Sequence, residues 1–295
     1  MVFERSIAPS GTKSFKFFVF PIVWMISLLP FCVLNGISTA ICFLLYNVFK
    51  YRLKVVRANL TNAFPSKSAQ ELLEIERKFY LHLSDLFTET IKALSISKIQ
   101  ITERVKNVDI QIYDQFFNEG KSIVVVMSHC GNWEYICLAS PIQCKQQIQC
   151  VYKSLSSSGW DWLMYKIRSK FGTNPFTMEN TLRAMVKNRD TVTINAFVGD
   201  QNPSSGTNAY WSDFLHQDTA FMMGPEKIAK KFNLPVVYLS TKKVKRNHYE
   251  FNTVVLTESP NNFSDGELTE LIIRHTESEI LQQPEIWLWS HRRWK

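Results

Sequence analysis

The chain has 295 residues, a formal net charge of +8 at pH 7 and a hydrophobic share of 45%, with aromatic residues making up 13%. This composition excludes a disordered chain and is typical of a globular or membrane-attached protein that is long enough to bury a full core. The positive charge favours an anionic partner, namely nucleic acid, anionic lipid or an acidic carrier protein, but no basic stretch interleaved with aromatics supports nucleic acid.

The six cysteines form no C-x-x-C motif, and no group of cysteine and histidine residues has the spacing of a zinc site. We therefore expect reduced thiols on the cytoplasmic side of a membrane. Phosphate-binding loops and dinucleotide fingerprints are missing from the sequence as well. Hence neither a metal nor a cofactor is expected.

The N-terminal region contains no charged side chain over residues 17–49, a span of 33 residues. As one helix this span would be roughly 50 Å long, which exceeds the ~30 Å hydrocarbon core of a bilayer. We expect breaks at Pro21, Pro30 and Asn35-Gly36, and hence one spanning helix with a shallower interfacial piece, or a re-entrant pair. A buried core helix of a soluble protein is the alternative.

Basic residues are denser after this span than before it, at Lys50, Arg52, Lys54 and Arg57. By the positive-inside tendency, the large C-terminal part then lies in the cytoplasm. We therefore predict a membrane anchor with a basic flank over residues 1–57 and one larger domain over residues 58–295.

The rest of the chain alternates between helical and extended patterns. Residues 59–65 are expected to form an irregular link, and Ser66 or Ser68 then caps a long amphipathic helix. Short apolar strands are expected at about 122–127, 148–152, 191–198, 235–240 and 249–257, and helices at about 159–170, 178–188, 223–232 and 266–282. Strands that alternate with helices predict an α/β fold whose sheet is covered on both faces.

The segment at residues 128–134 follows a run of β-branched residues that is typical of a buried strand. This strand delivers His129 to its carboxyl end, where open α/β sheets place their chemistry, and Glu134 follows where a helix could begin. Such a pair can act as a general base, with Glu134 fixing the tautomer of His129. Glycine lets a ligand approach the backbone, so we expect Gly131 and Asn132 to contact substrate. The alternative is a core histidine beside a helix-capping glutamate.

The sequence offers no convincing nucleophile of its own. A G-x-S-x-G elbow is missing, which disfavours serine-hydrolase chemistry. Cys130 adjoins His129, but side chains that are adjacent in sequence generally point in different directions, so packing is the better interpretation of Cys130. His129 would therefore activate a hydroxyl of the substrate, in a direct transfer without a covalent enzyme intermediate.

Three further polar positions follow expected strands and helices. Arg168 closes a helix, where it either complements the helix C-terminus or stabilises an oxyanion or a phosphate. Tyr152 and Lys153 leave a strand and would meet an anionic headgroup or carrier, or else lie on the solvated surface. Asp200 and Gln201 end the next strand, where they either bind substrate or form a turn.

The chain ends in an aromatic and basic segment from Trp287 to Trp294. Tryptophan and arginine are typical of membrane interfaces, so this segment would contact the membrane. The alternative is a terminal lid that covers the site.

Together these segments resemble the bacterial lipid A biosynthesis acyltransferase family, the late or secondary acyltransferases of the lysophospholipid acyltransferase superfamily. The resemblance runs in order along nearly the whole chain. Besides the apolar N-terminal anchor, the matching pieces are Arg57-Ala58-Asn59-Leu60, Phe64-Pro65, Ser128-His129 through Glu134, Arg168, Phe171-Gly172, Asp200-Gln201, Phe214-Leu215 to Thr219, Gly224-Pro225-Glu226 and Trp287 to Trp294. The superfamily motif is His-x4-Asp, and Glu134 is a variant that this family uses.

The resemblance implies a mixed central sheet flanked by helices, with residues 58–295 as the catalytic domain of an inner-membrane enzyme. It implies transfer of an acyl chain from acyl carrier protein, or coenzyme A, to a hydroxyl of a lipid A precursor in the membrane. In that reaction His129 deprotonates the hydroxyl and Glu134 holds the imidazole. Arg168 or nearby backbone N–H groups would stabilise the oxyanion.

Other functions remain open on the sequence. The same chemistry would serve another glycolipid or aminolipid as the acceptor. A lipid hydrolase or thioesterase would use His129 and Glu134 to activate water instead. In a non-catalytic membrane-binding protein, His129 would be structural.

Overall fold

A seven-stranded mixed sheet forms the centre of the computed structural model, which describes residues 8–203 and 209–294. Its strands lie in the order β1-β9-β8-β2-β5-β3-β4. Neighbouring strands are parallel except for β8 and β9, which are antiparallel. The strands are β1 Val105–Asn107, β2 Ile123–Met127, β3 Gln147–Tyr152, β4 Asn174–Thr177, β5 Thr193–Val198, β8 Val236–Lys245 and β9 His248–Thr257. The expected α/β fold with a mixed central sheet is confirmed.

The side chains of β2 alternate between the two faces of the sheet. Val125 and Met127 belong to the core on one face, whereas Val124 and Val126 belong to the core on the other. Because helices cover both faces, all of β2 is buried and its sequence is apolar throughout. The first face is covered by α5 Lys98–Arg104, α6 Ile110–Asn118, α7 Trp133–Gln143 and α8 Ser158–Arg168, and the second by α9 Thr181–Lys187, α10 Gly224–Phe232 and α11 Glu267–Gln282.

The N-terminal residues form two apolar helices. A π-helical turn at Phe15–Val19 leads into α1 Phe20–Leu28, and α2 Phe31–Phe43 continues through a second π-helical turn at Leu44–Val48. The break between the helices falls at Pro30, as expected. Pro21 instead lies in the first turn of α1, where proline is tolerated, and Asn35-Gly36 lie inside α2. The breaks predicted at these two places are therefore wrong.

Helix α4 Ala69–Lys92 packs against both α2 and α3 Leu53–Ala63. It begins with a capping box, in which Ser68 Oγ accepts from the Glu71 N–H and the Glu71 carboxylate accepts from the Ser68 N–H. The predicted cap at Ser68 is thus confirmed. Because α3 continues through Ala63, the irregular link predicted at residues 59–65 is wrong over most of its length.

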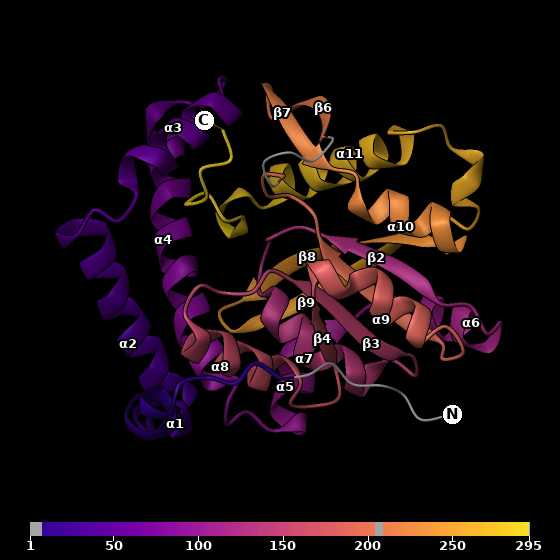
Figure 1. Cartoon of the computed structure of the whole chain (residues 1–295). Helices are drawn as coiled ribbons and strands as arrows, with labels where there is room; N and C mark the ends of the chain where they lie inside the picture. Colours follow the sequence, from indigo (N-terminus) through magenta and orange to yellow (C-terminus); the bar gives the residue numbers. More distant parts are fainter. Residues whose placement is uncertain (1–7, 204–208, 295) are drawn as a thin grey trace.

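The C-terminal segment returns to the side of α3 (Figure 1). There Asn59 Nδ2 donates to the carbonyl oxygens of Trp289 and His291, at 2.9 and 3.0 Å. Trp287 and Trp289 are 2% and 0% exposed, so these two residues belong to the protein core and the predicted membrane contact is wrong for them. A separate hairpin of β6 Ala209–Phe214 and β7 Gln217–Met222 packs beside α11.

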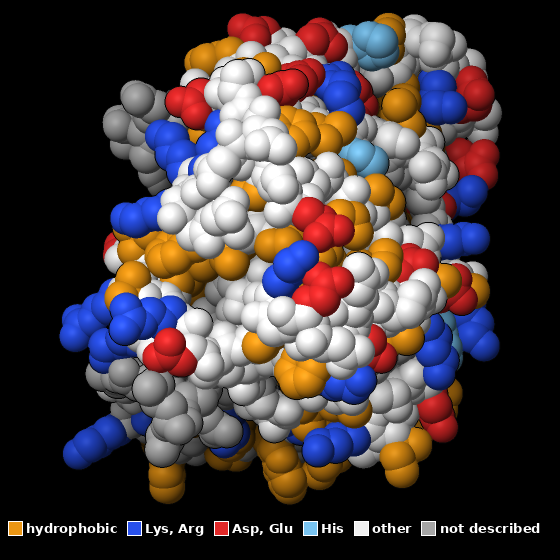
Figure 2. Space-filling model, turned by 90° about the vertical axis from the view of Figure 1, so that its right-hand side faces the viewer, with side chains coloured by type: hydrophobic (Ala, Val, Ile, Leu, Met, Phe, Trp, Pro, Cys, Tyr) orange, Lys and Arg blue, Asp and Glu red, His pale blue; other side chains and the backbone are white. Residues whose placement is uncertain are grey.

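The two sides of the molecule differ in surface character. Charged side chains of both signs are scattered over the face in Figure 2. On the opposite side, α1, α2 and the residues that flank them expose large apolar side chains, including Phe18, Trp24, Phe43 and Phe49. Among the described residues, Phe31–Val48 is the segment long and apolar enough to cross a membrane. Most of its side chains are not buried, whereas the core helix of a soluble protein would be mostly buried.

Candidate active site

His129 and Asp200 meet at the carboxyl edge of the sheet because they follow neighbouring strands in register. β2 and β5 are parallel, with Met127 paired to Val198, and His129 and Asp200 each lie two positions beyond these residues. His129 Nδ1 lies 2.5 Å from Asp200 Oδ1, and the His129 backbone N–H donates to Asp200 Oδ2 at 3.0 Å. Strand pairing therefore brings together two residues that are far apart in the sequence.

Asp200 is buried behind the imidazole and held by donors from two segments. Besides the two His129 groups, Trp287 Nε1–H donates to Asp200 Oδ2 at 2.7 Å. Burial alone would raise the pKa of Asp200, but the charge of His129 and these hydrogen bonds outweigh it and lower the pKa to about 2. Asp200 is consequently ionised at neutral pH.

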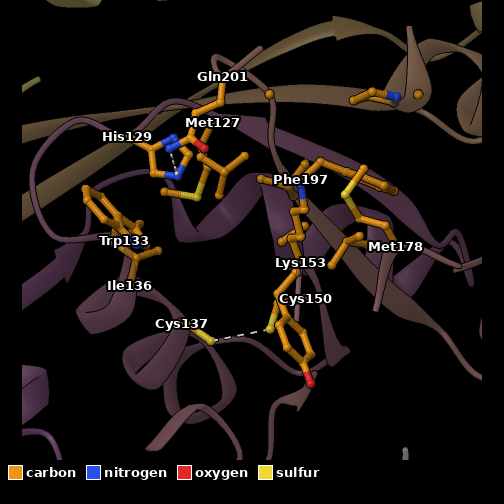
Figure 3. A pocket seen from close by; sticks show the side chains of 18 of the residues that line it. Met127, His129, Trp133, Ile136, Cys137, Cys150, Lys153, Met178, Phe197 and Gln201 are labelled. Atoms are coloured by element: carbon orange, nitrogen blue, oxygen red, sulfur yellow. Dashed lines mark hydrogen bonds between the residues drawn. The ribbon is translucent and has the colours of Figure 1, made fainter. Parts of the chain in front are cut away.

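The other imidazole nitrogen faces the cavity. Because an ionised carboxylate only accepts hydrogen bonds, Nδ1 carries the hydrogen in neutral His129 and Nε2 keeps its lone pair. Gln201 Nε2 lies 3.3 Å from that nitrogen and has N–H groups to donate to it. The Trp133 ring contacts the imidazole edge to face, with centroids 4.8 Å apart. Figure 3 shows His129, Gln201 and Trp133 together at one end of the cavity.

Glu134 does not occupy the position predicted for it. Its carboxylate binds Arg168 through two parallel hydrogen bonds, at 2.8 and 2.5 Å, while Asp200 holds His129 Nδ1 instead. The reason is that Glu134 lies in the first turn of α7 and points across to the C-terminal end of α8. Burial opposes the charge of Arg168, but attraction to Glu134 raises its pKa above the ordinary value for arginine.

Gly131 and Asn132, which were predicted to contact substrate, make structural contacts beside His129. Gly131 has a positive φ of 62°, and a Cβ placed there would lie 2.4 Å from Thr241 Cγ2. Asn132 is buried, accepts from the Tyr135 N–H at the start of α7 and donates to the buried Glu89 carboxylate. Both residues therefore shape the turn that carries His129, and neither is among the residues that line the cavity.

The cavity in front of His129 has a volume of about 940 Å³. Six of the predicted site residues line its wall, namely His129, Glu134, Tyr152, Lys153, Arg168 and Gln201. Asp200 lies behind His129, hydrogen-bonded to it, and is not part of this wall. Apolar side chains from β2, β3, β5 and α7 line most of its inner part. At the far end in Figure 3, Cys137 and Cys150 face each other with 3.8 Å between their sulfur atoms. This shape suits a long apolar chain whose reactive end lies beside His129.

The thiols of Cys130, beside His129, and of Cys137, in the cavity wall, are not suited to nucleophilic attack. Cys130 is fully buried, and burial raises its pKa well above the ordinary value for cysteine. The contact with Cys150, and then burial, raise the pKa of Cys137 as well. Because the thiolate is the reactive form, a raised pKa disfavours both as nucleophiles.

A further contact that was not expected from the sequence is that of Trp287 with Asp200. The aromatic C-terminal segment was a visible signal, but its pattern does not specify which residue it contacts. An isolated antiparallel bridge between Cys130 and Trp287 brings this segment beside the turn that carries His129.

Comparison with known protein families gives a match over nearly the whole chain. Residues 4–295 match the family model described as bacterial lipid A biosynthesis acyltransferase. A search of curated proteins finds no match.

Proposed function

Because the chain belongs to the bacterial lipid A biosynthesis acyltransferase family, we propose that it moves a fatty acyl chain from a thioester directly onto a hydroxyl of a lipid A precursor. The observation that carries the mechanism is His129 itself. Asp200 holds Nδ1 at 2.5 Å, and Nε2 is directed into a cavity of about 940 Å³. This geometry is that of a general base, because Nε2 can accept a proton from a substrate hydroxyl.

The proposed reaction needs only groups present in the chain and its two substrates. His129 Nε2 takes the proton of the acceptor hydroxyl, and the hydroxyl oxygen forms a bond to the thioester carbonyl carbon. The tetrahedral intermediate then breaks its carbon–sulfur bond, and the leaving thiolate takes the proton from the imidazolium. Asp200 stabilises the imidazolium between these steps and acts as a positioning residue.

Glu134 and Arg168 have a different proposed role from His129 and Asp200. Glu134 accepts from Nε and from one hydrogen of Nη2 of Arg168, so Nη1 and the second hydrogen of Nη2 remain for a substrate oxygen. The pair lies in the cavity wall, and a fixed positive group there would stabilise the oxyanion of the tetrahedral intermediate. Glu134 thus positions Arg168 rather than His129.

The proposed acyl donor is acyl carrier protein, with coenzyme A as the other thioester that fits the same chemistry. The net charge of +8 supports an acidic carrier, because opposite charges accelerate and orient association. The inner part of the cavity, lined by apolar residues, supports a long acyl chain.

We further propose that the protein is anchored in the inner membrane with its sheet on the cytoplasmic side. The exposed apolar side chains of α1 and α2 support the anchor, and the basic residues that follow α2 support the orientation. Such an anchor would hold the cavity close to a lipid acceptor.

Two measurements on the full-length protein in detergent test this function. Acyl transfer from an acyl carrier thioester to a lipid A precursor should proceed in the wild type and fall by about 10²–10⁴ in His129→Ala. Release of fatty acid from the thioester should require acceptor, whereas a hydrolase would release it at the full rate without acceptor. Mass spectrometry of lipid A from cells with and without the gene then tests the acceptor. An unchanged acylation pattern would contradict lipid A as the substrate.

A further inference from the structure

A group of basic side chains in the cavity wall comes from two segments that are distant in sequence. Arg52 directly precedes α3, and His291 and Arg292 belong to the C-terminal segment. Arg52 Nη1 donates to the Ser290 carbonyl oxygen at 2.9 Å, which joins the two segments. Asn59 reinforces this contact through the His291 carbonyl oxygen at 3.0 Å. The three basic side chains are therefore parts of one wall.

The charge of this group is not neutralised by the protein. Arg168, in the same cavity, forms an ion pair with Glu134 through two hydrogen bonds. In the part of the chain that the structure describes, Arg52 and Arg292 form no ion pair with a carboxylate. Two guanidinium groups therefore remain available to an anion that enters the cavity.

The backbone around Arg52 is strained in a way that fixes this residue. Lys50 and Arg52 both have left-handed conformations, with φ of 48° and 51°. Such a conformation is unfavourable for a residue with a side chain. Between them, Tyr51 is held by hydrogen bonds from its N–H to Leu45 and from Tyr80 to its carbonyl oxygen. The surrounding structure thus maintains a costly turn that directs Arg52 to the cavity wall.

His291 contributes an unsatisfied donor or acceptor. Its Nδ1 is buried and has no hydrogen-bond partner among the described residues. Buried polar atoms are normally paired, so this atom calls for a ligand or a water molecule. Burial lowers the pKa of His291, and although Asp200 opposes this, Arg293, His129 and Arg52 lower it further. The site is therefore rich in positive charge, and an anion there would favour the protonated imidazole.

We propose that Arg52, His291 and Arg292 form a phosphate-binding subsite in the wall of the cavity that contains His129. Guanidinium groups bind phosphate oxygens through paired N–H donors, and the imidazole would supply one more. The phosphate ester would belong to one of the two substrates, either to the acceptor headgroup or to the phosphopantetheine arm of the donor. This assignment rests on the proposed function, whereas binding of the anion itself does not.

Direct binding tests the subsite without any acyl transfer. The full-length protein in detergent is titrated with inorganic phosphate and with glycerol phosphate at constant ionic strength, and thermal unfolding is followed. Both should raise the unfolding temperature of the wild type, and the saturation point should move to at least tenfold higher concentration in Arg52→Gln and Arg292→Gln. Lys54→Gln is the matched control, because it removes the same charge from α3 outside the cavity and should titrate like the wild type.

Steady-state kinetics then separates the two sources of phosphate. With the acceptor phosphate as ligand, Arg52→Gln raises the KM for the phosphorylated acceptor about tenfold and leaves that for the dephosphorylated acceptor unchanged. With the donor phosphate as ligand, Arg52→Gln instead raises the KM for a phosphopantetheine thioester about tenfold. Its KM for an N-acetylcysteamine thioester, which has no phosphate, stays unchanged. Equal titration of wild type, Arg52→Gln and Lys54→Gln by phosphate would overturn the subsite, whether or not acyl transfer occurs. A different result would separate the two proposals. If Arg52→Gln loses phosphate binding but the wild type transfers no acyl chain to any acceptor, the subsite is supported and the proposed function is contradicted.

Discussion

The cavity contains two acid–base pairs that are built differently. His129 and Asp200 are joined across two strands, through one imidazole nitrogen at 2.5 Å, and the second nitrogen faces the cavity. Glu134 and Arg168 are joined across two helices, through two hydrogen bonds at 2.8 and 2.5 Å. In the first pair, the second nitrogen of His129 can exchange a proton. In the second pair, the positive charge of Arg168 is held in a fixed place.

The difference shows how one cavity can separate proton transfer from fixed electrostatics. A histidine anchored at one nitrogen can gain and lose a proton at the other. A guanidinium bound to a carboxylate stays charged, and here its pKa is raised further above the ordinary value. On this contrast, damage to the first pair should mainly reduce turnover, whereas damage to the second should reduce stability as well as turnover.

The largest expected effect on turnover comes from Asp200→Asn. An amide at this position can neither stabilise the imidazolium nor enforce a hydrogen on His129 Nδ1, so Nε2 would lose its lone pair in part of the molecules. We expect kcat to fall by about 10³–10⁴-fold while the KM values change little. Steady-state acyl transfer measures this, and a decrease of less than tenfold would show that Asp200 does not position the base.

The largest expected effect on stability comes from Glu134→Ala. It leaves the Arg168 guanidinium, whose side chain is only 18% exposed, without its carboxylate. Removing one partner of a buried ion pair costs about 3–5 kcal/mol of unfolding free energy. The control is the double variant Glu134→Leu with Arg168→Met, which removes both charges and should recover most of that loss. Urea unfolding in detergent measures both, and equal stability of Glu134→Ala and wild type would refute the structural role.

Much of the fold follows from local patterns in the sequence. The β-branched run forms strand β2, and Ser68 caps α4 in a capping box with Glu71, as their residue types predict. The strand β4 was missed because it is short and contains Pro175, which is unusual inside a strand. α3 was missed because Pro65 suggested an irregular segment over residues that are in fact helical.

The partner of His129 could not be predicted for a different reason. Sequence spacing shows that Glu134 is near His129 along the chain, but the partner is set by which strands are neighbours. β5 lies next to β2, with β3 one strand further out, so Asp200 rather than any residue near β3 reaches the imidazole. Both His129 and Asp200 follow apolar strands by two residues, and this shared offset is the signal that would have indicated the pairing.

A moderate effect is expected in acid. The pKa of Asp200 is about 2 in the folded protein against an ordinary 3.8, so ionised Asp200 contributes about 2 kcal/mol to stability at neutral pH. Because the folded pKa is the lower one, this contribution is complete above about pH 4 and is lost as the pH falls through about 2. Between pH 5 and pH 2 the wild type should therefore lose about 2 kcal/mol more unfolding free energy than Asp200→Asn. Parallel losses in both proteins would contradict the assigned pKa.

The smallest effect separates the indole contact with Asp200 from ordinary aromatic packing. Trp287→Phe removes the Nε1–H that donates to Asp200 at 2.7 Å and keeps most of the buried ring. Trp289→Phe is the matched control, because its Nε1–H donates to the Pro284 carbonyl oxygen instead.

Both variants should lose about 1 kcal/mol of unfolding free energy, since each loses one hydrogen bond. Only Trp287→Phe should also lower kcat, by about fivefold, because the carboxylate that holds the imidazole is then less firmly placed. Acyl transfer at saturating substrate and urea unfolding on the same preparations distinguish the two effects. If kcat falls equally in both variants, the contact of Trp287 acts through packing alone, and the positioning of His129 depends on Asp200 without help from the C-terminal segment.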